Sequence, residues 1–125
     1  MRLLLDTHVL LWVLADDPAL SPESRGLIGR AETVYVSAVS VWEVSIKAAL
    51  GKLKIDQDGF LEGLRESGFT PLAISWDHAA AVRQLPDYHR DPFDRMLIAQ
   101  ALAEPLRLLT HDRTLALYSE LVTLV

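Results

Sequence analysis

Short apolar runs alternate along the chain with longer stretches in which apolar residues recur at helical spacing. Leu3-Leu4-Leu5 is apolar without interruption, as in a strand that is buried on both faces. The following stretch places Val9, Trp12 and Val13 three to four residues apart, as on the buried face of a helix. The pattern predicts strands at residues 3–5, 33–36, 69–74 and 106–109, with a short fifth at 121–124. It predicts helices at residues 7–15, 21–31, 40–50, 57–67, 75–84 and 91–103.

Capping residues support several of these boundaries. Ser21-Pro22-Glu23 is typical of a helix that begins with a serine N-cap, a proline in the first turn and an acid near the positive end of the helix dipole. Gly51 suits the position that follows the helix ending at residue 50. Asp91-Pro92 has the composition expected where the last long helix begins.

Strands that are apolar along their length and separated by helices predict a parallel sheet covered on both faces. Ligands of such sheets bind beyond the carboxyl ends of the strands. Asp6 directly follows the first predicted strand, and Thr110 and Asp112 directly follow the fourth. We therefore expect these two acids, which are far apart in the sequence, at the same rim of the sheet.

The size and composition are those of an ordinary soluble domain. With 125 residues, of which 50% are hydrophobic and 23% charged, the chain is expected to form a single domain over residues 1–125. It has no cysteine, which excludes disulfides and thiolate metal sites. The apolar run before Asp6 is too short for a signal peptide, and no stretch approaches the ~18 apolar residues of a membrane span. A cytoplasmic protein without membrane association is expected.

The formal net charge of −5 lacks the basic character that usually favours nucleic-acid binding. Bound divalent cations would balance acidic residues that act as metal ligands. Four acids are candidates for that role: Asp6, Glu43, Asp94 and Asp112. The acidic balance is therefore compatible with a metal-dependent nuclease, although it does not favour one.

Each of these acids also has a structural explanation. Asp6 precedes a predicted helix, where its carboxylate could cap backbone N–H groups. Glu43 lies three residues after Ser40, as in a capping box, and it could also pair with Lys47 one turn later. Taken one at a time, neither acid distinguishes a structural role from a metal-binding one.

Two further acids begin the last long helix, and another follows the fourth strand. Asp91 suits the N-cap and Asp94 the third helical position, so we assign the structural role to Asp91 and the ligand role to Asp94. Because it is close to Asp94 in the sequence, Asp91 is nevertheless a candidate to support the metal ligands without binding the metal itself. Asp112 falls in a turn, where a turn-forming aspartate is the alternative to a ligand.

Convergence at one rim favours the metal-binding explanation. Crowded carboxylates repel one another unless protons or cations neutralise them. A ligand set of oxygens without cysteine favours Mg²⁺ or Mn²⁺ over zinc, and one or two such ions could activate water and stabilise the leaving oxygen of a phosphodiester. Four hydroxyls could support the ligands by hydrogen bonds, although helix capping is their commoner role: Thr7, Ser37, Ser40 and Thr110.

Four segments each carry one of the acids in order: LLLDTHVLLW with Asp6, VSAVSVWEV with Glu43, HRDPFDRMLIAQA with Asp94, and LLTHD with Asp112. These segments resemble the motifs of the PIN-domain nucleases, in particular the VapC-type toxins of prokaryotic toxin–antitoxin pairs. The resemblance runs essentially from end to end. It implies a three-layer α/β/α sandwich with a mostly parallel sheet, Mg²⁺-dependent cleavage of RNA, a VapB-type antitoxin that covers the site, and a homodimer.

Several other residues have alternative roles. Three lysines could contact phosphate at the rim, although a solvated helix end or turn is more common: Lys47, Lys52 and Lys54. The tryptophans are expected in the core, with partner contact as the alternative for the first two: Trp12, Trp42 and Trp76. None of the histidines is expected to bind metal, and the last is expected to lie nearest the site: His8, His78, His89 and His111.

Other functions fit parts of the pattern. A phosphatase with a covalent aspartate would also place Asp6 at the end of the first strand, but it requires a second aspartate two residues later, where this chain has His8. A catalytically inactive PIN-fold binding module would retain the fold, and the complete set of acids argues against it. A structure-specific DNA nuclease is a further alternative, although the chain is short for a separate module that grips a duplex.

Overall fold

The computed structural model describes residues 1–125 and contains one five-stranded sheet with the strand order β3-β2-β1-β4-β5. The strands are β1 (Arg2–Leu5), β2 (Thr33–Ser37), β3 (Thr70–Leu72), β4 (Arg107–Thr110) and β5 (Val122–Leu124). All neighbouring strands are parallel. The strand order changes direction between β1 and β4, and such switch points form crevices at the carboxyl ends of the strands.

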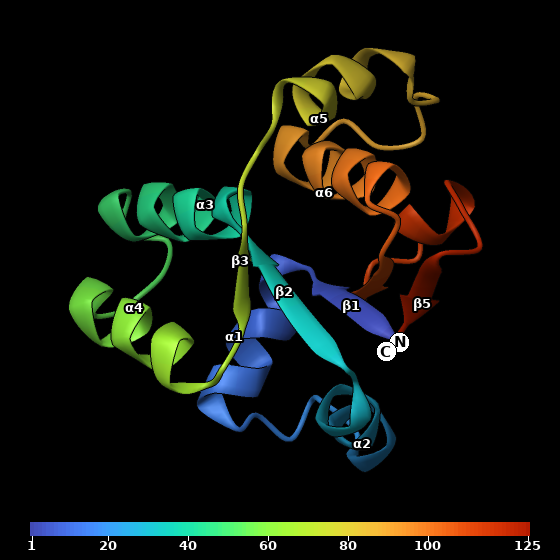
Figure 1. Ribbon diagram of the computed structural model, residues 1–125. Helices are drawn as coiled ribbons and strands as arrows, with labels where there is room; N and C mark the ends of the chain where they lie inside the picture. Colours follow the sequence, from blue (N-terminus) through green and yellow to red (C-terminus); the bar gives the residue numbers. More distant parts are fainter.

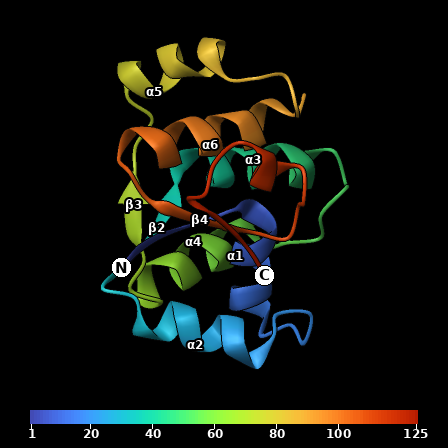
Figure 2. The same ribbon diagram turned by 90° about the vertical axis from the view of Figure 1, so that its right-hand side faces the viewer.

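Helices cover both faces of the sheet (Figure 1). They are α1 (Thr7–Ala15), α2 (Pro22–Arg30), α3 (Ala38–Ala49), α4 (Gln57–Glu66), α5 (Trp76–Ala81) and α6 (Pro92–Ala103), with 3₁₀ turns η1 (Val82–Gln84) and η2 (Leu115–Leu117). Figure 2 shows α5 and α6 on one side of the strands, and α1, α2 and α4 on the other. This arrangement confirms the expected three-layer α/β/α sandwich. None of the helices has the length and apolar character needed to cross a membrane.

The apolar run that forms β1 packs against both helical layers. Leu3 and Leu5 belong to the core cluster that contains residues of α1 and α4, whereas Leu4 belongs to the cluster that contains residues of α6. Successive side chains of a strand point to opposite faces, so a strand between two layers must be apolar at every position. All three leucines are fully buried, and each stabilises the fold by roughly 1.5–3 kcal/mol.

The start of α3 differs from the prediction. Strand β2 runs directly into the helix, which begins at Ala38 with Ser37 as its N-cap, and the Ser37 hydroxyl accepts a hydrogen bond from the Val39 N–H at 3.1 Å. The predicted start at Ser40 is therefore wrong, as is the capping box between Ser40 and Glu43. Glu43 lies in the second turn of α3, where it does not cap the helix.

Two other predicted elements are shorter than expected. The strand predicted at residues 69–74 is limited to β3, Thr70–Leu72, which is hydrogen-bonded to β2 on one side only. The helix predicted at residues 75–84 is α-helical to Ala81 and continues as the 3₁₀ turn η1. Both differences lie at the periphery of the sandwich.

The tryptophans are less buried than expected. Trp42 is 58% exposed and Trp76 is 94% exposed, so the prediction of core positions is wrong for both. Trp12 is partly buried and packs against the core cluster of α1 and β1. Helical spacing indicates which residues share a face, but the width of the buried stripe depends on the packing partners.

Candidate active site

A cavity of about 410 Å³ lies at the carboxyl ends of β1 and β4. Its lining includes the four predicted acids, each from a different part of the fold: Asp6 after β1, Glu43 on α3, Asp94 on α6 and Asp112 after β4. The structure therefore brings together residues that are separated by most of the chain. The cavity is strongly polar, since only one of its 11 lining residues is hydrophobic.

Asp6 is both a helix cap and a member of the acidic cluster. Its Oδ1 accepts a hydrogen bond from the Val9 N–H at 2.8 Å, and its Oδ2 accepts a hydrogen bond from the Thr110 hydroxyl. Burial raises the pKa of Asp6 above its ordinary value, and these two hydrogen bonds offset the effect only in part. The role of Asp6 as a helix N-cap is therefore compatible with a role as a metal ligand.

Glu43 is 5% exposed and is held by two side chains. Its Oε1 accepts a hydrogen bond from the Thr7 hydroxyl at 2.7 Å, and its Oε2 pairs with Lys47 Nζ at 2.5 Å. The Ser40 hydroxyl lies 3.0 Å from Thr7 Oγ1 and donates to it, because the single Thr7 proton goes to Glu43, so Ser40 contacts the acid only through Thr7. The hydrogen bond with Glu43 raises the pKa of Lys47.

The two acids at the start of α6 have different environments. Asp91 is the N-cap of the helix, and its Oδ1 accepts hydrogen bonds from the Phe93 and Asp94 N–H groups at 2.8 and 3.2 Å. Asp94 lies within the first turn and faces the cavity. Burial, reinforced by repulsion from Asp91, raises the pKa of Asp94 to about 7. The positive charge near Asp94 is therefore too small to offset the burial of its carboxylate and the repulsion from Asp91.

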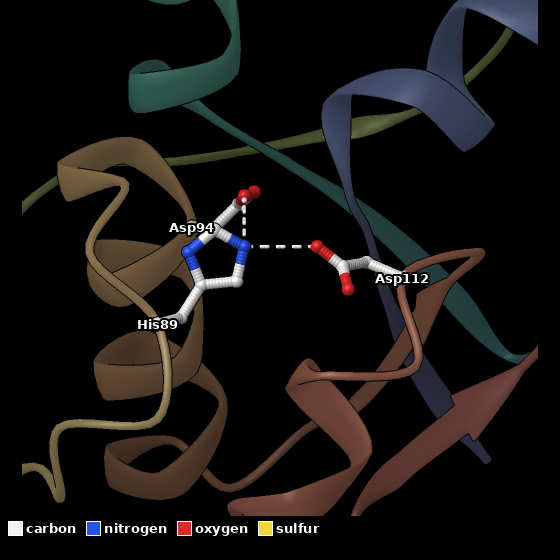
Figure 3. A group of neighbouring side chains, drawn as sticks. All are labelled: His89, Asp94 and Asp112. Atoms are coloured by element: carbon white, nitrogen blue, oxygen red, sulfur yellow. Dashed lines mark hydrogen bonds and ion pairs between the residues drawn. The ribbon is translucent and has the colours of Figure 1, made fainter.

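His89 lies between Asp94 and Asp112 (Figure 3). Its Nε2 is 3.3 Å from Asp94 Oδ2 and 2.9 Å from Asp112 Oδ2. Burial would raise the pKa of Asp112, but the hydrogen bonds from His89 and from the Thr114 N–H outweigh burial and lower it. The expectation that His111 lies nearest the acids is wrong, because His89 is the histidine that contacts them.

The hydrogen bonds of His89 assign its tautomer. The Asp91 N–H donates to His89 Nδ1 at 3.0 Å, so Nδ1 carries the lone pair and the proton of the neutral ring lies on Nε2. In this state Nε2–H donates to the Asp112 carboxylate, lies near that of Asp94, and offers no lone pair to a cation. The backbone of His89 is also fixed, since its N–H donates to the Tyr118 hydroxyl at 2.8 Å and its carbonyl accepts from Arg95 at 3.2 Å.

The donor set of the cavity suits a hard divalent cation. Carboxylate oxygens are the ligands that Mg²⁺ and Mn²⁺ prefer in proteins. The raised pKa values of Asp6 and Asp94 indicate negative charge that is costly to bury without a counter-ion. Lys47 pairs directly with Glu43 alone, and Lys52 and Lys54 are exposed residues outside the cavity lining. The residues therefore fit one or two divalent cations.

Comparison with known proteins agrees with this geometry. The family model of the PIN domain matches residues 3–121. The chain is 33% identical over 119 residues to the ribonuclease VapC22 of Mycobacterium tuberculosis, and the match covers 90% of this chain and 88% of that protein.

Solved structures with low sequence identity share the fold. VapBC2 from Rickettsia felis, solved with a fragment of promoter DNA, is similar over 100% of this chain and 98% of that chain, with 16% identity and a TM-score of 0.72. VapBC-1 from nontypeable Haemophilus influenzae is similar over 100% of this chain and 97% of that chain, with 15% identity and a TM-score of 0.68. Because the family model spans nearly the whole chain, including all four acids of the cavity, this protein belongs to the PIN-domain family.

Proposed function

We propose that this protein is a divalent-metal-dependent endoribonuclease of the VapC type, the toxin of a toxin–antitoxin pair. The observation that carries the proposal is the convergence of Asp6, Glu43, Asp94 and Asp112 on one polar cavity. The similarity to a ribonuclease VapC supports RNA as the substrate. An RNA substrate and the absence of a membrane-spanning helix are compatible with a cytoplasmic site of action.

The four acids would hold one or two Mg²⁺ or Mn²⁺ ions. When bound, such ions supply positive charge that activates water and stabilises the leaving oxygen of a phosphodiester. Asp94 would be deprotonated in this state, because a nearby cation opposes the burial and repulsion that now raise its pKa.

Other residues of this chain set the direction of the carboxylates. Thr110 donates to Asp6 and also accepts a hydrogen bond from the Asp112 N–H at 3.1 Å, so one hydroxyl contacts both sides of the β1–β4 crevice. Thr7 performs a similar role for Glu43. These buried hydrogen bonds restrict the rotamers of the acids before any ligand arrives, which is the kind of preorganisation that supports catalysis.

Cleavage assays test this function directly. Purified protein, freed of any antitoxin, would be incubated with RNA or single-stranded DNA in Mg²⁺, Mn²⁺ or EDTA. We expect RNA cleavage that EDTA abolishes and that Asp6→Asn and Asp94→Asn each reduce on the order of 100-fold or more. Asp58→Asn, which alters an exposed acid on α4, is the matched control and should retain activity. Cleavage that persists in EDTA or in both site variants contradicts the proposal, and cleavage of DNA alone would assign a DNA nuclease.

A VapB-type antitoxin is the proposed protein partner. Several solved structures that share the fold are toxin–antitoxin complexes, which supports a partner of this kind. The surface also offers an apolar groove of about 510 Å³ between α3, α4 and β3, lined by residues that include Trp42, Leu64 and Phe69. Large exposed aromatic side chains are common anchors of protein interfaces. We therefore assign this groove to an apolar segment of the antitoxin.

Co-purification of this protein with the antitoxin tests this assignment. Trp42→Ala should weaken the complex with a VapB-type antitoxin by 10-fold or more, since a tryptophan anchor that becomes buried in an interface contributes ~2 kcal/mol or more. Trp76→Ala, which removes an even more exposed tryptophan outside the groove, is the control. An unchanged affinity in Trp42→Ala would place the interface elsewhere. Light scattering on the same samples determines whether the toxin is the expected homodimer.

A further inference from the structure

One wall of the acidic cavity is built from aromatic rings. His8 and Trp12 lie one turn apart on α1, and His111 follows β4. The ring centroids of Trp12 and His111 are 5.1 Å apart with an interplanar angle of 69°, and those of His8 and Trp12 are 6.0 Å apart at 52°. All three residues line the same cavity as the four acids.

This wall is accessible and firmly supported. His8 and His111 are exposed, while Trp12 is partly buried and packs against the core cluster of α1 and β1. The orientation of His111 is restrained, because its Nδ1 contacts the Val125 carbonyl at 2.8 Å. The hydrogen bonds that hold Asp6 and Asp112 come from other groups, so the three rings are not required to position these acids.

We propose that the wall formed by His8, Trp12 and His111 stacks a nucleobase of single-stranded RNA next to the phosphodiester bound at the carboxylates. This inference rests on the proposed ribonuclease function. Every base presents a flat aromatic face, and stacking on protein aromatics is the usual way in which unpaired nucleotides are held without sequence-specific hydrogen bonds. Rings that are supported by the core lose little freedom when a base binds, so the contact is preorganised.

The surroundings of the wall favour a nucleotide over a protein segment. Trp12 is the only hydrophobic residue that lines this cavity, and five of the remaining lining residues are acids. An apolar peptide would gain little from such a lining, whereas a nucleotide combines an aromatic face with an anionic phosphate that divalent cations attract. The groove assigned to the antitoxin is, by contrast, lined mainly by apolar residues.

Binding measurements with Ca²⁺ in place of Mg²⁺ test the wall separately from cleavage, because Ca²⁺ binds carboxylates in a looser geometry than Mg²⁺ while still supplying the positive charge that attracts phosphate. The probe is a fluorescein-labelled single-stranded RNA, compared with the same strand in which the central nucleotides lack their bases. The variants are Trp12→Phe, Trp12→Leu and the exposed-residue pair His8→Ala with His111→Ala, with Trp76→Leu as the control. Isothermal titration with Mn²⁺ on each variant reports whether the acidic cavity is intact.

We expect Trp12→Leu and the double histidine variant to weaken binding of intact RNA roughly 5- to 100-fold, with Trp12→Phe close to the parent. The same variants should bind the base-free strand as the parent does, and their Mn²⁺ affinity should be unchanged. Equal RNA binding by all variants, or equal losses on intact and base-free strands, overturns the inference.

If Trp12→Leu fails to fold, the binding result of the double histidine variant decides. If the parent cleaves RNA while the wall variants bind it normally, the ribonuclease function stands and only the stacking site is lost. A parent that neither binds nor cleaves RNA overturns both.

Discussion

His89 Nε2 lies 2.9 Å from Asp112 Oδ2 and connects the loop before α6 to the end of β4. The two residues are 23 positions apart, and the contact places a hydrogen-bond donor between acids that would otherwise face one another directly. The Asp91 N–H donates to His89 Nδ1, so the proton of the neutral ring lies on Nε2. The backbone of this loop therefore fixes His89 Nε2–H as the donor. The relationship makes His89 a positioning residue for two of the proposed metal ligands.

Replacement of His89 should weaken metal binding without removing a ligand. We expect His89→Ala to lower the affinity for Mn²⁺ on the order of 10-fold, because residues that orient metal ligands typically contribute 10- to 100-fold. His89→Gln, which can present an N–H near the position of Nε2, should recover part of the loss. Isothermal titration calorimetry measures both variants, and an unchanged affinity in His89→Ala would remove the positioning role.

The raised pKa of Asp94 predicts how stability depends on pH in the metal-free protein. An acid whose pKa is raised by folding stabilises the folded state at low pH, and this contribution is lost as the pH rises through the folded value. For Asp94 the loss falls between about pH 4, the ordinary range of an aspartate, and about pH 7. Asp94→Asn should therefore raise the melting temperature in EDTA at pH 8. The corresponding increase in the free energy of unfolding is on the order of 2 kcal/mol.

The same variant should differ least from the parent near pH 3, below the ordinary pKa of an aspartate, where Asp94 is mostly protonated in both the folded and the unfolded state. Melting curves at several pH values therefore provide an internal control. A difference between variant and parent that does not grow with pH would show that burial and repulsion at Asp94 are unimportant.

Loss of the Thr110 hydroxyl should destabilise the crevice between β1 and β4. Thr110 is fully buried, and its hydroxyl connects the Asp6 carboxylate with the Asp112 backbone. Thr110→Val retains the shape but leaves both groups without this partner, which costs about 2 kcal/mol. Thr110→Ser retains the hydroxyl and loses only a methyl group, with a cost of about 1 kcal/mol. Urea denaturation distinguishes the two, and equal losses would indicate that packing outweighs the hydrogen bonds.

Lys47 should compete with a cation for Glu43. Its ammonium group lies 2.5 Å from Glu43 Oε2 and supplies positive charge to the cavity lining. We expect Lys47→Met to raise the affinity for Mn²⁺ about threefold, because one positive charge is removed from the neighbourhood of the ligands. Lys52→Met, which changes an exposed lysine outside the cavity lining, is the control. A lower affinity in Lys47→Met would show that Lys47 orients Glu43 more than it neutralises it.

Much of the site was predictable because two local signals coincide. The strand predicted at residues 3–5 ends at Asp6, and the fourth strand ends just before Asp112, so the topology rule for parallel sheets places both acids at one rim. The Asp91 N-cap and the cavity position of Asp94 also follow from the pattern at the start of α6. The role of Ser40 was misjudged, because Ser37 is an equally good N-cap and no loop separates β2 from α3.

The sequence by itself determined where the strands and most helices lie and which acids follow the strands. These features depend on periodicity, capping and turn preferences, which act over a few neighbouring residues. Only the tertiary structure decided that Thr110 contacts Asp6 across 104 positions, that His89 lies between Asp94 and Asp112, and that Trp42 is exposed. Such contacts depend on how layers pack and how loops close over them, so the partner of a given side chain is set by parts of the chain that have no fixed spacing from it.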